Sequence, residues 1–166
     1  MLLRATAAAA LAVIAVIAAG CGGGNKPERT TSLAPGCEVD RIAKIANGFL
    51  GAVNSGARAR LGGFVSVSPS FLIHDGTGKN ELRVHLTRRS GVLRYFAERH
   101  MLHSHARMIS LRVAPGIDAN HVLIDFRLTR TAADFPRRGI TARLASGTAR
   151  VNCVTDRVER LLIQGP

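Results

Sequence analysis

The stretch HARMISLRVAPGIDANHVLIDFRLT, residues 105–129, decides the fold class. Apolar and polar side chains alternate with a period of two in its first and last segments, which is typical of strands that bury one face. Pro115-Gly116 and Asp118-Ala119-Asn120 separate the two segments as turn residues. We therefore expect two antiparallel strands joined by a hairpin-length connection, the second of them running from 121 to 129.

The alternation also predicts which face of each strand is buried. In the second strand, Val122, Ile124, Phe126 and Leu128 share the apolar face. Side chains on the opposite face must point away from the core, and Asp125 is one of them. For the first strand, the pattern predicts that the inward residues are Ile109, Leu111 and Val113.

Helical patterns precede these strands. Residues 37–54 carry apolar side chains at i, i+3, i+4, i+7, i+8 and i+11 from Ile42, which is one continuous helical stripe. A short helix is expected at 57–61, a strand at 71–74, and a helix at 90–99 with Ser90 as its N-cap. Strands at 141–153 and 157–163 follow. This order predicts an α+β fold, with helices packed on one face of a curved antiparallel sheet.

The same order resembles the nuclear transport factor 2-like (NTF2-like, or SnoaL-like) superfamily over residues 37–164. The matching features are a long helix ending GFLGAVNSG, a short one ending LGGFV, the helix SGVLRYFAERH and the strands after it. The resemblance implies a conical half-barrel with a pocket between sheet and helices. That superfamily includes isomerases, cyclases, dehydratases, transport adaptors and non-enzymatic binding modules, so the resemblance does not select one function.

The N-terminal segment carries Arg4 and then an apolar run that ends Ala18-Ala19-Gly20-Cys21. This order is typical of a secretory signal peptide, and the apolar core is shorter than the ~20 residues of a membrane-spanning helix. The cysteine resembles the lipid-modified residue of bacterial lipoproteins. We expect residues 1–20 to be a lipoprotein signal peptide. Cys21 would then carry the lipid, palmitate included, and anchor the chain at the extracytoplasmic face of the cell membrane.

The rest of the chain divides in two. Residues 21–36 are rich in Gly, Pro, Ser and Thr and show no apolar periodicity, so they predict a flexible tether. Residues 37–166 form one domain of ordinary size, long enough to bury a core.

A formal net charge of +12, nearly all of it from arginine, favours an acidic partner such as anionic lipid or an anionic cell-envelope polymer. Scattered arginines that only solubilise the surface are the alternative. Nucleic acid is disfavoured by the export signal, by Tyr95 as the single tyrosine and by the absence of tryptophan. The oligomeric state stays open, a dimer included.

Two cysteines follow Cys21, at Cys37 and Cys153. In an exported protein such a pair is usually oxidised, so we expect a disulfide that links the start of the long helix to the end of the third strand. Two reduced, buried cysteines are the alternative.

Residues that could carry chemistry are few. An acid–base enzyme of the isomerase or cyclase kind would need a side chain in the cone, and Asp125, His121 and Tyr95 are the weak candidates. His100, His103 and His105 form a weak metal-ligand pattern without a neighbouring carboxylate. No cofactor motif is present, and none is expected.

Three functions remain, and the sequence favours the first. It is a non-catalytic lipoprotein domain that binds an apolar ligand or an envelope partner. The second is an isomerase or cyclase that uses a pocket acid or base. The third is a basic protein that associates with anionic envelope polymers.

Overall fold

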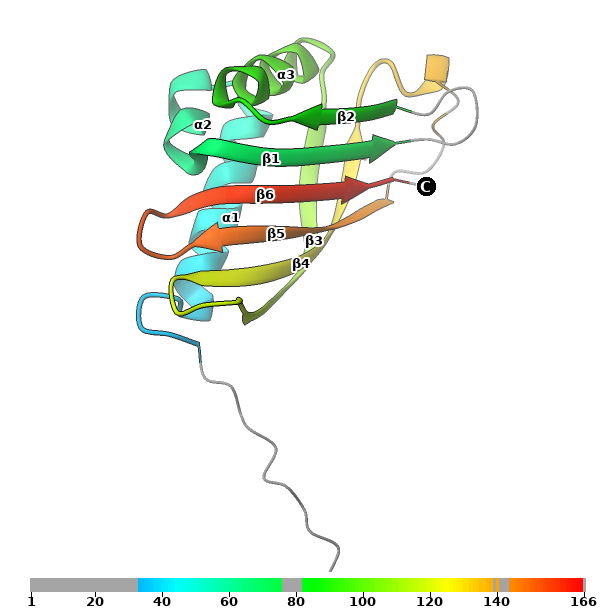
Figure 1. Cartoon of the computed structure of the whole chain (residues 1–166). Coiled ribbons are helices and arrows are strands. Elements are labelled where there is room, and N and C mark those ends of the chain that lie inside the picture. Colours follow the sequence, from blue (N-terminus) through cyan, green and yellow to red (C-terminus); the bar gives the residue numbers. More distant parts are fainter. Residues whose placement is uncertain (1–32, 76–81, 139, 141–143, 166) are drawn as a thin grey trace, which may run out of the picture. The chain divides into compact units, whose positions relative to one another are not determined.

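The computed structural model describes residues 33–75, 82–138, 140 and 144–165. In these ranges, α1 (Val39–Asn54), α2 (Arg58–Phe64) and α3 (Arg89–Met101) lie on one side of a six-stranded sheet (Figure 1). The strands are β1 (Val65–Asp75), β2 (Leu82–Leu86), β3 (His105–Pro115), β4 (His121–Thr131), β5 (Leu144–Asn152) and β6 (Arg157–Gln164). The predicted α+β class is confirmed.

The strand order across the sheet is β2-β1-β6-β5-β4-β3. All neighbours are antiparallel except β1 and β6, which run parallel, with Phe71 opposite Leu161 and Ile73 opposite Ile163. The prediction of a purely antiparallel sheet was therefore wrong at this one pairing. Local periodicity shows that a segment is a strand but not which strand it pairs with, so the sequence carried no signal for the parallel pair.

Strand β1 is longer than predicted, since it begins directly after α2 at Val65. Pro69 lies inside it, and the register with β6 shifts between Val65 and Ser70. Proline cannot donate to a strand ladder and is tolerated at such an irregularity. The edge strand β2 was not predicted at all.

Strand β3 contains a bulge that changes which side chains face inward. Its register with β4 shifts between Met108 and Ser110, and Ile109 is 49% exposed. The prediction that Ile109 faces inward was wrong, because one extra residue reverses the alternation on one side of the bulge. Leu111 and Val113 do pack against the core, as expected.

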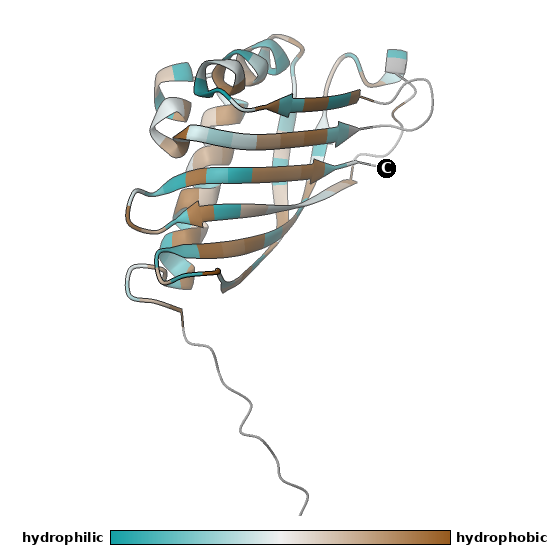
Figure 2. Cartoon of the chain, viewed as in Figure 1, coloured by the Kyte–Doolittle hydropathy of each residue, from teal (hydrophilic) through white to brown (hydrophobic). Residues whose placement is uncertain are grey.

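Strand β4 follows the predicted alternation. Val122, Ile124, Phe126 and Leu128 are all buried, and the residues between them are exposed. Hydrophobic and hydrophilic segments alternate visibly along the strands (Figure 2). Burial of four such side chains stabilises the fold by roughly 1.5–3 kcal/mol each.

The helices differ from prediction only at their ends. Helix α1 buries Ile42 and Ile45 of the predicted stripe, and also Ala52, which lies outside it. Helix α2 extends to Phe64, through two glycines. Helix α3 begins at Arg89, so Ser90 lies within the helix and is not its N-cap.

At Gly147, the backbone of β6 and the Phe126 ring come close to β5. A Cβ atom there would lie 2.1 Å from the Leu162 carbonyl oxygen and 2.5 Å from the Phe126 ring. Real Cβ atoms do not approach other atoms so closely, so only glycine lets the Phe126 ring lie over β5.

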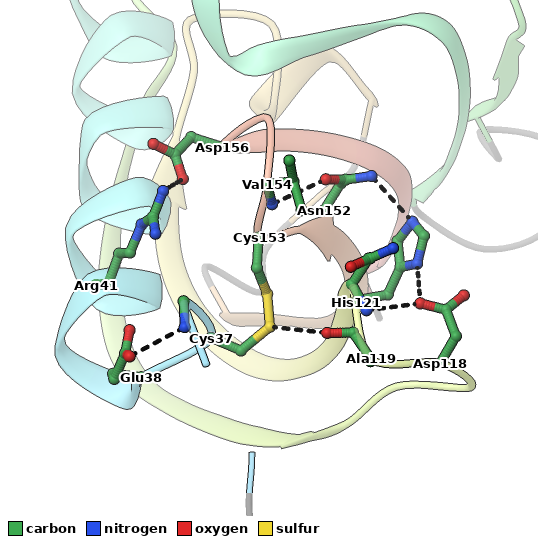
Figure 3. The surroundings of a disulfide bond; sticks show 12 residues. Cys37, Glu38, Arg41, Asp118, Ala119, His121, Asn152, Cys153, Val154 and Asp156 are labelled. Carbon is green, nitrogen blue, oxygen red and sulfur yellow. Dashed lines mark hydrogen bonds and ion pairs between the residues drawn. A yellow bond between two sulfur atoms is a disulfide. The ribbon is translucent and has the colours of Figure 1, made fainter. Parts of the chain in front are cut away.

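Cys37 and Cys153 form the predicted disulfide (Figure 3), with their Cα atoms 5.2 Å apart. Both cysteines are buried. Two contacts reinforce this end of the domain: Arg41 of α1 pairs with Asp156 at 2.8 Å, and the Cys153 amide donates to the Asn120 carbonyl at 2.8 Å. The bond therefore fixes the start of α1 to the β5–β6 turn.

The expected signal peptide and Cys21 lie outside the described residues, as does the expected tether up to residue 32. Leu33 and Ala34, at the end of that expected tether, pack against the core. None of the helices in the described part is both long enough and apolar enough to cross a membrane.

Candidate functional site: an apolar cavity with a basic end

A cavity of about 110 Å³ lies between the helices and the inner face of the sheet. Four elements contribute its apolar core: Phe49 from α1, Phe96 from α3, Phe126 from β4 and Leu161 from β6. Small residues keep the space open, among them Ala46, Ala106 and Ala149. The further apolar lining is Leu50, Val53, Ile73, Met108, Ile124, Leu128, Phe135, Val151, Val158 and Ile163.

An aromatic cluster from α1, α3 and β1 packs at the cavity. The Phe49 ring meets the rings of Phe71 and Phe96 edge-on, with centroids 6.2 and 5.9 Å apart. The Tyr95 and Phe96 rings are likewise edge-on, at 5.3 Å. Such pairs each contribute about 0.5–1.5 kcal/mol beyond their buried area.

Among the described residues, the polar ones that line the cavity are Tyr95, Arg99, Ser104 and Arg130. Arg130 follows Leu128 in the inward alternation of β4 and is only 8% exposed. Its guanidinium lies 5.3 Å from the centroid of the Phe135 ring, a cation–π distance. A positively charged side chain thus lies at an inward-facing position of β4, where the alternation predicts an apolar residue.

Arg99 reaches the same ring from α3. Its guanidinium lies 5.8 Å from the Phe135 centroid and donates two hydrogen bonds to Asp134, at 2.6 and 2.9 Å. The two side chains are only 12% and 14% exposed, so this is a largely buried, bidentate ion pair. The pair fixes the loop after β4 against the C-terminal turn of α3.

No protein-family model matches the chain, and no curated protein does. A Streptomyces avermitilis protein described as a proposed dehydratase of the NTF2-like family superimposes with a TM-score of 0.58 and 15% identity. The match covers 77% of this chain and 94% of that one.

Two further solved structures are similar to this chain. A protein of ketosteroid isomerase-like fold from Catenulispora acidiphila, solved with trimethylamine, gives a TM-score of 0.50 at 12% identity and covers 72% of this chain and 83% of that one. The orange carotenoid protein of Anabaena, solved with canthaxanthin, gives 0.58 at 9% identity over 72% of this chain and 35% of its own.

The domain has the NTF2-like fold. At these identities the likeness concerns the fold alone, so the chemistry has to come from the side chains. In this NTF2-like domain the cavity occupies the space between the sheet and α1 and α3.

Of the three acid–base candidates, one lines the cavity of the NTF2-like domain. That residue is Tyr95. Asp125 is exposed on the other face of β4, directly across from Arg112 of β3. An opposite-charge pair across two strands is an ordinary stabilising arrangement on an outer face. Asp125 therefore lies where it cannot touch a molecule held in the cavity.

His121 lies at the disulfide end of β4, within a polar cluster (Figure 3). Its Nδ1 is 2.6 Å from an Asp118 carboxylate oxygen, and its Nε2 is 3.2 Å from Glu159. Glu159 in turn accepts a hydrogen bond from Arg150 at 2.7 Å. The ring, with its side chain 15% exposed, joins the β3–β4 turn to β6, and it does not line the cavity.

His121 and the two carboxylates beside it, Asp118 and Glu159, shift one another's pKa values. The hydrogen bond that His121 donates to Asp118 raises the pKa of His121, against the lowering effect of burial. That same hydrogen bond lowers the pKa of Asp118. Burial alone would raise the pKa of Glu159, but hydrogen bonds from His121, Arg150 and Asn152 outweigh it and leave the pKa lowered. Both carboxylates therefore favour the charged form of the imidazole.

The metal-ligand candidates do not converge. His100, His103 and His105 are all exposed, and His103 adopts a positive φ of 51° in the turn after α3. His100 instead packs against Gly56, where a Cβ would lie 2.4 Å from the imidazole. Over the ranges that the structure describes, His, Cys, Asp and Glu nowhere gather in a group of three that could hold a metal ion.

The sequence analysis missed Arg99, Arg130, Asp134 and Phe135. A signal for one of them was present: Arg130 continues the inward alternation of Val122 to Leu128, and a charged residue in such a position is unusual. Arg99 meets Asp134 and Phe135 only through the fold, since Arg99 of α3 and Asp134 of the loop after β4 are 35 residues apart along the chain.

Proposed function

We propose that this chain is a cell-envelope lipoprotein whose NTF2-like domain is a non-catalytic module that binds a small apolar molecule. The lining of the cavity carries the proposal. Seventeen of its 21 residues are apolar, and no carboxylate or imidazole is among the lining residues that the structure describes. Ligand sites have this character: mostly apolar walls with a few polar groups that orient the ligand.

The size of the cavity limits the ligand. A volume of about 110 Å³ is somewhat below the ~150 Å³ of an engineered apolar cavity that binds benzene. A single aromatic ring or a short alkyl chain is therefore the appropriate scale, with modest widening at the side chains that line the cavity.

Titration with benzene and indole, followed by NMR of the methyl groups of Ile124 and Leu161, tests the binding proposal. We expect saturable shifts at these two residues, which line the cavity. Ala149→Leu should abolish them by filling the space, whereas Asp125→Asn, on the outer face of β4, should leave them intact. Equal responses in the two variants, or none in the wild type, would contradict the proposal.

The envelope location rests on the N-terminal pattern alone: Arg4, an apolar core, small residues and Cys21. Expression in a bacterium with a lipoprotein pathway should yield a chain that partitions into detergent. Cys21→Ser should move the protein to the aqueous phase. A Cys21→Ser protein that stays membrane-bound at high salt would show that the anchor lies elsewhere.

An isomerase or cyclase remains the alternative, and Tyr95 supports it because its side chain lines the cavity. Tyr95→Phe distinguishes the two. The variant should bind benzene and indole as the wild type does if the domain is only a binding module. Turnover of a small ketone substrate that is lost in Tyr95→Phe would establish an enzyme instead.

Association with anionic polymers is the third function. The outer sheet face mixes signs, since Arg112 lies opposite Asp125, which gives this function less support than the cavity gives the first. Sedimentation with anionic vesicles or polymer should then show weak binding that salt removes.

A further inference from the structure

We propose that the outer face of the sheet carries a second binding site, for an acidic saccharide. The site lies across β3, β4, β5 and β6, on the face turned away from the helices, so it is separate from the cavity. A hollow of about 320 Å³ marks it, and seven of the ten described residues that line this hollow are polar. The inference goes beyond the proposed function, because it does not depend on what the cavity binds.

Strand register places the side chains of the hollow in two adjacent rows. Side chains directly opposite each other on paired strands lie on the same face of the sheet. One row is Ser110, Arg127, Ser146 and Gln164, and the next is Arg112, Asp125, Thr148 and Leu162. Neighbouring strands are ~4.8 Å apart, so each row across four strands spans about 14 Å. This length suits a short oligomer better than a single small molecule.

The arginines of these rows can meet an anion. Arg112 and Arg127 are exposed, and neither forms an ion pair within the part of the chain that the structure describes. Two further exposed arginines, Arg107 and Arg160, stand at outward positions of β3 and β6. Guanidinium groups bind carboxylates in a planar, bidentate geometry. The positive charge of this face therefore favours a ligand that carries carboxylates.

Asp125 limits which anion can bind here. It is exposed on β4, between Arg112 and Thr148 in its row. An ionised carboxylate only accepts hydrogen bonds, so it repels a ligand that carries nothing but negative charge, and it needs a donor opposite it. Sugar hydroxyl groups supply such donors, and they can also pair with the hydroxyls of Ser146 and Thr148. The mixed charge that disfavours a plain polyanion thus suits an acidic saccharide, which carries both carboxylates and hydroxyl groups.

NMR titration with three probes tests this inference: trigalacturonate, its neutral trimethyl ester and tripolyphosphate. The backbone amides of Ser146 and Thr148 are the reporters, at 0.15 M salt, where screening limits the effect of distant charges. We expect trigalacturonate to shift both amides and to bind at least ~10-fold more tightly than the ester, as charge-assisted hydrogen bonds imply. Equal affinities, or no shift with trigalacturonate, would overturn the inference.

Matched variants locate the contact on the outer face. Arg127→Gln should weaken trigalacturonate by ~10-fold or more and leave the ester nearly unchanged. Arg60→Gln makes the same change of charge at an exposed position of α2, on the helical side of the sheet, so it should alter neither affinity. Equal losses in the two variants would show that only the net charge matters and would contradict the site.

Asp125→Asn separates a saccharide from a plain polyanion. The change removes a repulsive charge, so tripolyphosphate should bind this variant more tightly than the wild type. Trigalacturonate should instead bind ~3-fold or more weakly, because its hydroxyl groups lose a charged acceptor. Tighter binding of both probes would refute the saccharide.

A second copy of this chain is the competing occupant of the face. Amide shifts of Ser146 and Thr148 that follow the protein concentration, with no saccharide present, would show an interface between copies and refute the site. The titration of the cavity with benzene and indole is a separate measurement. Loss of trigalacturonate binding with normal benzene binding refutes this inference alone, and the reverse result refutes only the proposed function.

Discussion

Asn54 and Ala106 exchange two hydrogen bonds. The Asn54 side-chain amide donates to the Ala106 carbonyl at 2.7 Å, and its oxygen accepts from the Ala106 amide at 2.9 Å. The last residue of α1 thus pairs with β3 as a neighbouring strand would. Because Ala106 also lines the cavity, this contact determines how closely α1 approaches the far side of the sheet.

Asn54→Ala should destabilise the domain by about 1–3 kcal/mol, since it leaves two partly buried backbone groups without these partners. Urea unfolding measures the loss. Ser55→Ala is the matched control, because the Ser55 hydroxyl donates a local hydrogen bond, to the Ala52 carbonyl at 3.2 Å. Similar stabilities for the two variants would show that the Asn54 contact contributes little.

Gly147→Ala should destabilise the domain by about 1–3 kcal/mol or more, because its Cβ would collide with the Leu162 carbonyl and the Phe126 ring. Gly51→Ala is the control: nothing lies within 4 Å of a Cβ there, inside α1. That change should stabilise by about 0.5–1 kcal/mol through helix propensity. Thermal unfolding of both variants checks the opposite signs, and a tolerated Gly147→Ala would contradict the close packing described here.

The polar cluster around His121 predicts a pH-dependent stability. Its pKa is raised above the ordinary 6.5, so its charged form stabilises the fold below that pH, and this contribution is lost as pH rises through the folded value. The lowered pKa values of Asp118 and Glu159 work in the other sense: their contribution is present above the ordinary 3.8 and 4.5 and is lost on acidification.

Wild type and His121→Gln should therefore differ most between about pH 5 and 6 and converge toward pH 9 in urea unfolding. His85→Gln serves as the control, because that exposed ring lies 3.4 Å from the Ser70 hydroxyl rather than between carboxylates. A wild-type advantage over His121→Gln that stays constant from pH 5 to 9 would show that the charge on His121 does not contribute.

The disulfide should contribute about 4–5 kcal/mol in the chain-entropy model, because it closes a loop of more than one hundred residues. Denaturant unfolding of the Cys37→Ser, Cys153→Ser double variant measures this loss. In a Cys21→Ser background, thiol titration of the unfolded, unreduced protein should find no free thiol and two after reduction. Two thiols before reduction would refute the bond.

The sequence was a good guide wherever structure depends on local alternation. It predicted the inward face of β4, the stripe of α1 and the pairing of Cys37 with Cys153, since each follows from periodicity or compartment. The sequence was a poor guide at the bulge near Ile109, where one extra residue reverses which side chains face inward. It also did not predict which strands are neighbours in the sheet, as in the parallel pairing of β1 with β6.

The candidate site was less predictable than the fold. Tyr95 was among the residues considered and lines the cavity, but the basic end was missed. Arg99 and Asp134 are 35 residues apart in the chain and meet through side chains from a helix and a loop. Neither element has a repeating pattern that points to the other, so only the folded arrangement reveals that contact.

Strand β6 lies between β1 and β5, although it is the last of the described strands along the chain. A growing chain can form the β1–β2 hairpin and the β3–β4–β5 meander early, but the two pieces share no strand until β6 has been synthesised. Until then each piece exposes an unpaired edge that can recruit another chain. Folding of this domain is therefore completed only after synthesis of the whole sheet, and a chain truncated before Arg157 should aggregate rather than fold in part.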